Sequence, residues 1–231
     1  MADGRPVDRL AQIAADFDRI ARMPEPNWTH NSWYHPLLLR HLKAARAQRV
    51  LEVGCGTGRL AASVAPFCRE VLGIDLSQEM IAAATDRHGH LPNVRFVHGD
   101  YLGFESARTW DAIISVSTAH HLDLKAFLSK AARELQPGGQ LLLVDLYEGS
   151  AADAMLNAAV LPLSLALRLW HNGRLRPAAA HAEAWKAHDQ HDHFLSMPEI
   201  RRIASAVLPG CRITRTLFWR YFLRWVKPAR I

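Results

Sequence analysis

The sequence predicts an α/β domain built on a mostly parallel sheet of seven strands. Short apolar runs alternate with amphipathic helical patterns through the first two thirds of the 231-residue chain. This alternation is typical of βαβ units and a parallel sheet. The C-terminal stretch "CRITRTLFWRYFLRWVKP" predicts two further strands, which turn near Arg220 and add an antiparallel hairpin to the sheet.

The elements follow from local patterns, taken in chain order. An N-terminal helical cap is expected over Val7–Arg22 and Trp33–Ala45, joined by the aromatic-rich "PEPNWTHNSWYHP". Five strands are then expected, at Arg49–Val53, Glu70–Ile74, Val94–His98, Trp110–Val116 and Gln140–Leu146. Between them, helices are expected at Arg59–Ala65, Ser77–Thr85 and Leu124–Leu135. Ser77 is the predicted N-cap of the second of these helices, and "QPGGQ" ends the third.

The region after Tyr147 carries an apolar segment, Ala154–Trp170, followed by a helical pattern in "FLSMPEIRRIASAV". Asn157, Pro162 and Arg168 interrupt the apolar segment, which is also short for a membrane span. Because it is apolar nearly all round, we expect it to be buried or to cover something. We favour a lid over a substrate. Hydrophobic core and a helix resting on a membrane surface are the alternatives.

Bulk composition points to a globular protein of a reducing compartment. The net charge is +6, but the arginines are spread along the chain, so we expect a solvated basic surface and not a nucleic-acid site. The three cysteines, Cys55, Cys68 and Cys211, show no metal-binding spacing. The N-terminus has no apolar run of the secretory type, and a cytoplasmic location is therefore expected.

The stretch "RVLEVGCGTGRL", residues 49–60, predicts a strand that ends in a glycine loop and opens a helix. Its glycines are Gly54, Gly56 and Gly58, in the pattern G-x-G-x-G. Arg59 occupies the place of the third glycine of a dinucleotide-binding loop, so the spacing disfavours NAD. Only glycine lets a ligand approach the backbone this closely without steric cost.

This loop resembles motif I of the class I S-adenosylmethionine-dependent methyltransferases. Later landmarks match in the same order: Asp75 ends the second strand, Gly99–Asp100 the third, and "WDAIISVSTAHHL" and "LQPGGQLLLVD" resemble the next two strands. The resemblance covers Arg49–Asp145 and implies a Rossmann-like methyltransferase fold with S-adenosylmethionine as cofactor. It also implies a single domain, divided into a helical cap (1–48), a cofactor-binding core (49–147), a lid or substrate insertion (148–195) and a C-terminal helix and hairpin (196–231).

The resemblance further implies a set of cofactor-binding residues at the strand ends. Asp75 would accept both ribose hydroxyls, since a carboxylate offers two acceptor oxygens. Glu52 would order the loop and the amino group of the methionine part, and Asp100 would accept from the adenine amino group. The remaining expected contacts are the backbone of Gly54, Cys55 and Gly56, then Leu76, Met80 and Tyr101 at the adenine, Val116 and Ser117 under the sulfonium, and Tyr34 on the cofactor carboxylate. Met80 fits the core equally well.

Catalytic candidates are His120 and His121, just past the fourth strand, where ligands meet open α/β sheets. Histidine titrates near neutral pH, so either residue could take a phenol or hydroxyl proton as a general base. The alternative is that the pair only orders its loop. Substrate contacts are expected from the cap, with Trp28 as a pocket wall or core residue and His30, Asn31 and His35 facing the substrate.

A histidine-rich stretch near residue 190 carries His181, His188, Asp189, His191, Asp192 and His193. On a helix, Asp189, Asp192 and His193 would share one face. A metal-dependent catechol-type enzyme would be expected to use acids at the ends of central strands, where only Asp145 is suggestive. We therefore interpret the stretch as a polar connection and expect no metal.

Missing motifs narrow the acceptor. The chain lacks the D/N-P-P-Y/F sequence of amino-methylating nucleic-acid enzymes, and none of its cysteines follows a proline as in cytosine C5 enzymes. No glutamate pair of the protein-arginine type is visible. The expected partner is a small-molecule methyl acceptor, apolar or aromatic, with an O, N, S or C nucleophile. An RNA methyltransferase and a non-catalytic cofactor-binding relative stay as alternatives. A membrane-surface contact is not favoured, and the sequence gives no indication of oligomeric state.

Overall fold

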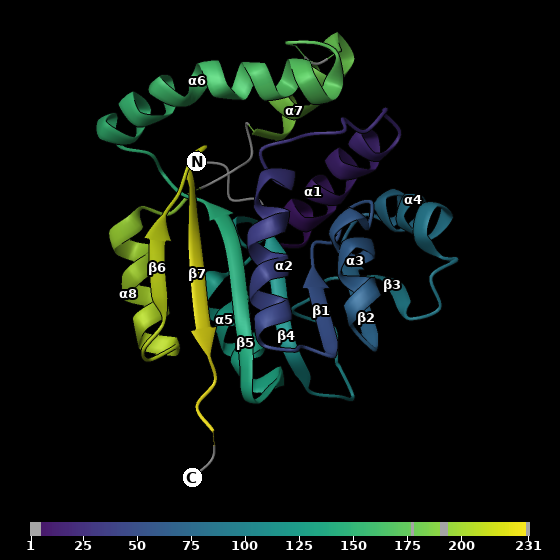
Figure 1. Ribbon diagram of the computed structural model, residues 1–231, viewed down its shortest axis with the longest axis vertical. Coiled ribbons are helices and arrows are strands. Elements are labelled where there is room, and N and C mark those ends of the chain that lie inside the picture. The colour runs from purple at the N-terminus through teal and green to yellow at the C-terminus, as the bar shows by residue number, and fades with distance from the viewer. Residues whose placement is uncertain (1–5, 177, 190–193, 230–231) are drawn as a thin grey trace.

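The seven strands of the sheet run in the order β3-β2-β1-β4-β5-β7-β6 (Figure 1). The computed structural model describes residues 6–176, 178–189 and 194–229. Pairing is parallel from β3 through β5, and antiparallel between β5 and β7 and between β7 and β6. The strands are β1 (Arg49–Val53), β2 (Glu70–Asp75), β3 (Val94–His98), β4 (Trp110–Val116), β5 (Leu135–Leu146), β6 (Arg212–Arg215) and β7 (Arg220–Val226). The predicted fold class is confirmed.

Helices cover both faces of the sheet and one of its ends. They are α1 (Pro6–Ala21), α2 (His35–Ala44), α3 (Arg59–Val64), α4 (Gln78–His88), α5 (Leu124–Glu134), α6 (Ala151–Asn172), α7 (Ala179–Asp189) and α8 (Met197–Val207). Short 3₁₀ turns lie at Ser32–Tyr34 (η1), Ala65–Phe67 (η2) and Ala119–His121 (η3). In Figure 1, α1, α6 and α7 gather beyond the end toward which β1 and β5 point. They cover the edge where ligands bind open α/β sheets.

The apolar strands are buried on both faces, so neighbouring residues serve two cores. Val50 belongs to the cluster that contains Leu42 of α2, while the next residue, Leu51, belongs to the cluster that contains Phe127 of α5 and Ile200 of α8. Such strands read as continuous apolar runs, because alternate side chains point to opposite faces. This explains why the five parallel strands are visible in the sequence.

Three sequence expectations are corrected by the fold. "QPGG" lies inside the long strand β5, whose pairing with β4 shifts register there. The hairpin turn is at residues 216–219, with Phe218 and Trp219 in the left-handed region (φ 60° and 56°), and Arg220 is the buried first residue of β7. The described part of the histidine-rich stretch, residues 181–189, which we interpret as a polar connection, belongs to α7 (Ala179–Asp189), which packs on α1.

The apolar segment Ala154–Trp170 lies within α6 and is mostly exposed. Met155 and Trp170 are 76% and 84% exposed. The alternative that this segment is hydrophobic core is therefore wrong.

Candidate active site

A cavity of about 690 Å³ lies at the carboxyl ends of the parallel strands. Its floor includes the ends of β1, β2, β4 and β5 and the start of β7, and its walls come from α1, α6, α7 and the segment between α1 and η1. The size is within the range of cavities that enclose most of a small organic ligand. The predicted site residues can be placed against this cavity one group at a time.

The glycine loop presents bare backbone to the cavity. Gly54 and Gly56 both line it, with φ of 74° and 51°. A side chain at Gly54 would collide with Thr118, since its Cβ would lie 1.9 Å from Thr118 Oγ1. A Cβ at Gly56 would meet nothing within 4 Å, so the space beside this residue is open. Gly54 is therefore required by packing, and Gly56 leaves room for a ligand.

Two carboxyl groups flank the loop. Asp75 Oδ2 accepts from Gly56 N at 2.8 Å and Asp75 Oδ1 accepts from Ser77 N at 2.9 Å, which fixes the carboxylate at the end of β2. Each oxygen retains a second lone pair for a ligand hydroxyl. Burial raises the pKa of Asp75, and the two backbone N–H groups oppose that effect.

Glu52 lies on β1 and is 3% exposed. Its Oε2 atom has no hydrogen-bond partner among the described residues. Burial raises the pKa of Glu52 well above its ordinary value. A buried acceptor without a partner is costly, and a cationic donor in the cavity would remove that cost.

The predicted adenine contacts differ in what their side chains do in the structure. Leu76, Met80, Asp100 and Tyr101 all line the cavity, as do Cys55, Val116 and Ser117. The hydroxyl of Tyr101 donates to Glu134 Oε2 at 2.9 Å, so it is engaged in the core and not with a ligand edge. Met80 packs with Ile20 and Ala184, and it serves core and cavity together.

The structure also corrects the expected position of Tyr34. Its hydroxyl lies 2.5 Å from the carbonyl oxygen of Leu217 and 3.0 Å from Thr216 Oγ1, at the β6–β7 turn. The side chain is 4% exposed and is not among the residues that line the cavity. It anchors η1 to the hairpin, which contradicts the expected contact of Tyr34 with the cofactor carboxylate.

His120 and His121 both line the cavity, from η3 after β4. His120 Nδ1 lies 2.6 Å from Asp145 Oδ1, and both side chains are nearly inaccessible to solvent. Asp145 is itself held by the backbone N–H of Leu146 at 2.9 Å. An ionised Asp145 places the proton of a neutral imidazole on Nδ1, which makes Nε2 the basic nitrogen.

His121 has a different environment. Its ring packs edge-to-face against Phe17 at 5.6 Å and against His188 at 5.0 Å, in an aromatic cluster contributed by α1 and α7. Of the two histidines, His120 has the arrangement of a general base.

Arg220 is a functional candidate that the sequence reasoning missed. It is 8% exposed and lines the cavity. Its guanidinium donates to Asn31 Oδ1 at 2.6 Å, to the Phe218 carbonyl at 2.7 Å and to Ser117 Oγ at 3.3 Å. Burial lowers the pKa of Arg220 to about 10, which keeps it cationic at neutral pH.

The neighbours of Arg220 are held in place around it. Ser117 donates to the same Asn31 oxygen at 2.8 Å and has a left-handed backbone (φ 51°). Such strain at a cavity edge is tolerated where surrounding contacts impose it. No local sequence pattern indicates this cluster, because Arg220 is expected near a turn.

Four residues of the cap reach the cavity. Trp28, His30, Asn31 and His35 all line it. The His30 ring stacks on Phe218 at 4.2 Å, and its Nε2 lies 2.9 Å from Ser164 Oγ of α6. Burial, assisted by Arg220 and Arg168, lowers the pKa of His30 to about 4. Burial and Arg59 lower the pKa of His35 to about 4, so both imidazoles are neutral at pH 7.

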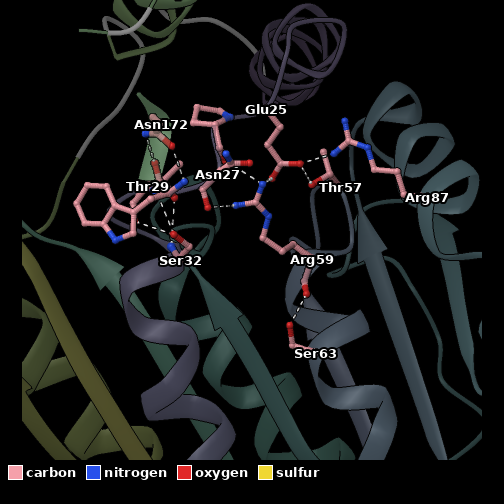
Figure 2. A network of polar contacts seen from close by, with 11 residues as sticks. Glu25, Asn27, Thr29, Ser32, Thr57, Arg59, Ser63, Arg87 and Asn172 are labelled. Carbon is pink, nitrogen blue, oxygen red and sulfur yellow. Dashed lines mark hydrogen bonds and ion pairs between the residues drawn. The ribbon is translucent and has the colours of Figure 1, made fainter. Parts of the chain in front are cut away.

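Figure 2 shows how the segment between α1 and η1 is fastened over the glycine loop. Arg59 donates to the carbonyls of Pro26 and Asn27 at 2.8 and 2.9 Å, and it pairs with Glu25 at 3.1 Å. Glu25 also accepts from Thr57 at 2.8 Å and pairs with Arg87. The arginine that replaces a dinucleotide glycine therefore holds the cap in place.

The histidine-rich stretch is only partly described. His181 and His188 belong to α7, and His188 is buried beside Asp16, with 3.5 Å between Nδ1 and Oδ2. His191, Asp192 and His193 lie outside the described residues. Within the described ranges, no group of three or more His, Cys, Asp or Glu side chains could hold a metal ion.

Comparison with known proteins agrees with this geometry. The family model described as "Methyltransferase domain" matches residues 50–139. An uncharacterized methyltransferase from Mycobacterium tuberculosis is 30% identical over 215 residues, covering 90% of this chain and 100% of the relative.

Solved structures show the same fold. The chain is similar to N-methyltransferase NodS from Bradyrhizobium japonicum WM9 in complex with S-adenosyl-l-homocysteine, with a TM-score of 0.64, 18% identity, and coverage of 94% of this chain and 98% of that one. It is also similar to magnesium protoporphyrin IX methyltransferase (ChlM) from Synechocystis PCC 6803 with bound SAM. There the TM-score is 0.63 and the identity 15%, over 95% of this chain and 97% of that chain.

Proposed function

The chain belongs to the class I S-adenosylmethionine-dependent methyltransferases, and we propose that it methylates a small, apolar or aromatic acceptor at a hydroxyl or phenol oxygen. The observation that carries the proposal is that one cavity contains both halves of such a site. The glycine loop and Asp75 line it, and so does His120, whose Nδ1 atom is paired with Asp145 behind it.

The residues present fit the cofactor. Asp75 would take the two ribose hydroxyls with its remaining lone pairs, and the partnerless Glu52 Oε2 would take the ammonium of the methionine part. The open space at Gly56 would let the cofactor cross the end of β1. Asp100 would accept from the adenine amino group, with Leu76 and Met80 against the ring.

Bound S-adenosylmethionine supplies an electrophilic methyl group, and the protein chiefly has to align a nucleophile with it. His120 Nε2 would take the acceptor's proton as general base. Asp145 would act as a positioning residue, since it holds the imidazole in the correct tautomer and stabilises the imidazolium that forms. The Arg220 guanidinium would stabilise the developing negative charge on the acceptor oxygen.

The apolar walls support an apolar or aromatic acceptor. Phe17, Leu122, Trp185 and Phe194 line the cavity near the two histidines, and the Phe194 ring lies 5.2 Å from that of His120. These side chains would exclude water from the reacting atoms. We also propose that Trp28, His30, Asn31 and His35 face the substrate, since all four line the same cavity.

We also propose that α6 and its flanking residues form a lid over the substrate. Arg168 and Asn172 of α6 line the cavity, which supports a covering role for residues 148–195. Deleting Ala154–Trp170 should remove activity and keep cofactor affinity if the segment is a lid. Loss of folding would indicate that it is needed for stability.

The first test is calorimetric titration with S-adenosylmethionine and, separately, with NAD. We expect the wild type to bind S-adenosylmethionine, and Asp75→Asn to bind it about 10- to 100-fold more weakly, because charge-assisted hydrogen bonds to the ribose are lost. Asp123→Asn is the matched control, since Asp123 caps α5 outside the cavity. Binding of NAD alone, or equal affinities in all three proteins, would overturn the cofactor assignment. Acceptors would then be screened with the binding-competent enzyme.

A further inference from the structure

Helix α6 is amphipathic, but its apolar side faces outward and its polar side faces the rest of the domain. Its outward side is apolar: Met155, Leu161, Leu169 and Trp170 are 76%, 54%, 52% and 84% exposed. Its inward side is polar, and Asp153, Asn157 and Ser164 are 4–5% exposed. In a water-soluble domain the helix face toward the core is normally the apolar one. The outward side of α6 is therefore built for an environment other than water.

Polar contacts fix this orientation. Asp153 accepts from the Tyr147 hydroxyl at 2.7 Å, and His30 and Ser164 meet at 2.9 Å. At the other end, the Asn172 side chain accepts from the Trp28 backbone N–H at 2.8 Å and donates to the Trp28 carbonyl at 2.9 Å. Rotating the helix to bury its leucines would break all of these bonds. The apolar exposure is thus a property of the fold.

Exposed apolar side chains also lie beyond both ends of the helix. Trp219 is 41% exposed and contacts the chain just before α6, because a Cβ on Gly149 would lie 2.8 Å from Trp219 Cδ1. It has a left-handed backbone (φ 56°), which is unfavourable for a bulky residue. Leu175, beyond the C-terminal end, is 47% exposed and also lines the cavity. Tryptophans thus stand near both ends, as in proteins that sit at a membrane–water interface.

Charge identifies the occupant of this surface. Between Ala154 and Asn172 the sequence has no acidic residue, and Arg174 and Arg176 are exposed just beyond the helix. The chain carries a net charge of +6. A second copy would present the same basic flank and repel it, whereas an anionic lipid surface attracts it.

We propose that α6 docks flat on an anionic lipid bilayer, with its apolar outward side in the interface. By length and composition α6 is the one helix in the described ranges that could cross a membrane. Its buried polar side, bonded to the domain, favours lying in the interface over spanning it. Arg168 and Asn172 of the same helix line the cavity, so docking places the cavity beside the bilayer.

The test is co-sedimentation of the intact protein with vesicles of phosphatidylglycerol and phosphatidylcholine, against vesicles of phosphatidylcholine alone. We expect binding to the anionic vesicles that weakens as salt is raised. The double variant Leu161→Gln/Trp170→Gln should reduce vesicle partitioning at least about tenfold, since both side chains leave water on docking. Arg174→Gln/Arg176→Gln should reduce the preference for anionic lipid.

Val226→Gln is the matched control, because Val226 is 44% exposed at the end of β7, on the opposite end of the molecule from α6 (Figure 1). Thermal melting would show that each variant is folded. Absence of vesicle binding by the wild type would overturn the proposal. In that case sedimentation velocity would test for a dimer. A dimer that the α6 double variant abolishes would show that a second copy of the chain occupies this surface. Both readouts are independent of methyl transfer, so the proposed function could fail while docking holds.

Discussion

Substituting Gly56 by alanine should separate folding from cofactor binding. The residue has φ of 51°, and a Cβ there would meet nothing within 4 Å. Alanine would therefore cost only the left-handed backbone, about 1–2 kcal/mol of the free energy of unfolding. The same methyl group would enter the space that we assign to the cofactor. Overpacking of that kind costs about 1–3 kcal/mol, so S-adenosylmethionine should bind about 10- to 100-fold more weakly.

Gly138→Ala is the matched control. Gly138 has φ of 80°, a Cβ there would also meet nothing within 4 Å, and the residue is not part of the cavity lining. Urea unfolding should show similar losses of stability in the two variants, and calorimetry should show weakened binding only for Gly56→Ala. Equal S-adenosylmethionine affinities in both variants would refute the placement of the cofactor at Gly56.

Three further predictions concern protonation, catalysis and the cap. The pKa values of His30 and His35 are about 4 in the folded protein and 6.5 ordinarily, so the unfolded chain binds more protons between those values. Unfolding free energy should therefore fall as pH drops from about 6.5 to about 4, by about 1–3 kcal/mol for each histidine. His30→Gln and His35→Gln should each flatten that slope in urea titrations, and unchanged slopes would contradict the assignment. Asp145→Asn should lower kcat about 100-fold or more with little change in KM, because the His120 tautomer is no longer fixed. An equal loss in S-adenosylmethionine affinity would indicate a structural role instead. Glu25→Gln should speed dissociation of S-adenosylmethionine in stopped-flow measurements, since it loosens the segment over the glycine loop. Glu79→Gln, which breaks the exposed pair with Arg22, should leave that rate unchanged.

The sheet was predictable from the sequence because its strands are buried on both faces. β1, β3 and β4 have the bounds that the apolar runs predict, and Ser77 caps α4 by accepting from Met80 N at 3.1 Å, as its position before the helix indicates. These features depend on neighbours in the chain. The glycine loop is visible for the same reason, since backbone conformation limits the residue type locally.

The contacts that complete the site were not predictable, because they join distant segments. Asp145 is 25 residues from His120, and Arg220 is 189 residues from Asn31. Nothing in either local sequence selects the partner. Tyr34 shows that the direction of a side chain can also depend on a distant segment. A tyrosine in the cap could face the cavity or the hairpin, and the packing of β6 and β7 decides between them.

The polar side of α6 was predictable in part from the sequence. Its polar residues Asp153, Asn157, Ser164, Arg168 and Asn172 fall on one side of a helix, since their spacings are close to whole turns. The sequence therefore contained a polar stripe, but composition alone described the segment as apolar nearly all round. A polar stripe on an apolar helix marks the side that meets water or hydrogen-bonding groups. Here those groups are His30, Tyr147 and the backbone of Trp28, all within the same chain. The protein thus satisfies the polar side of α6 internally, which leaves the apolar side for an external apolar phase.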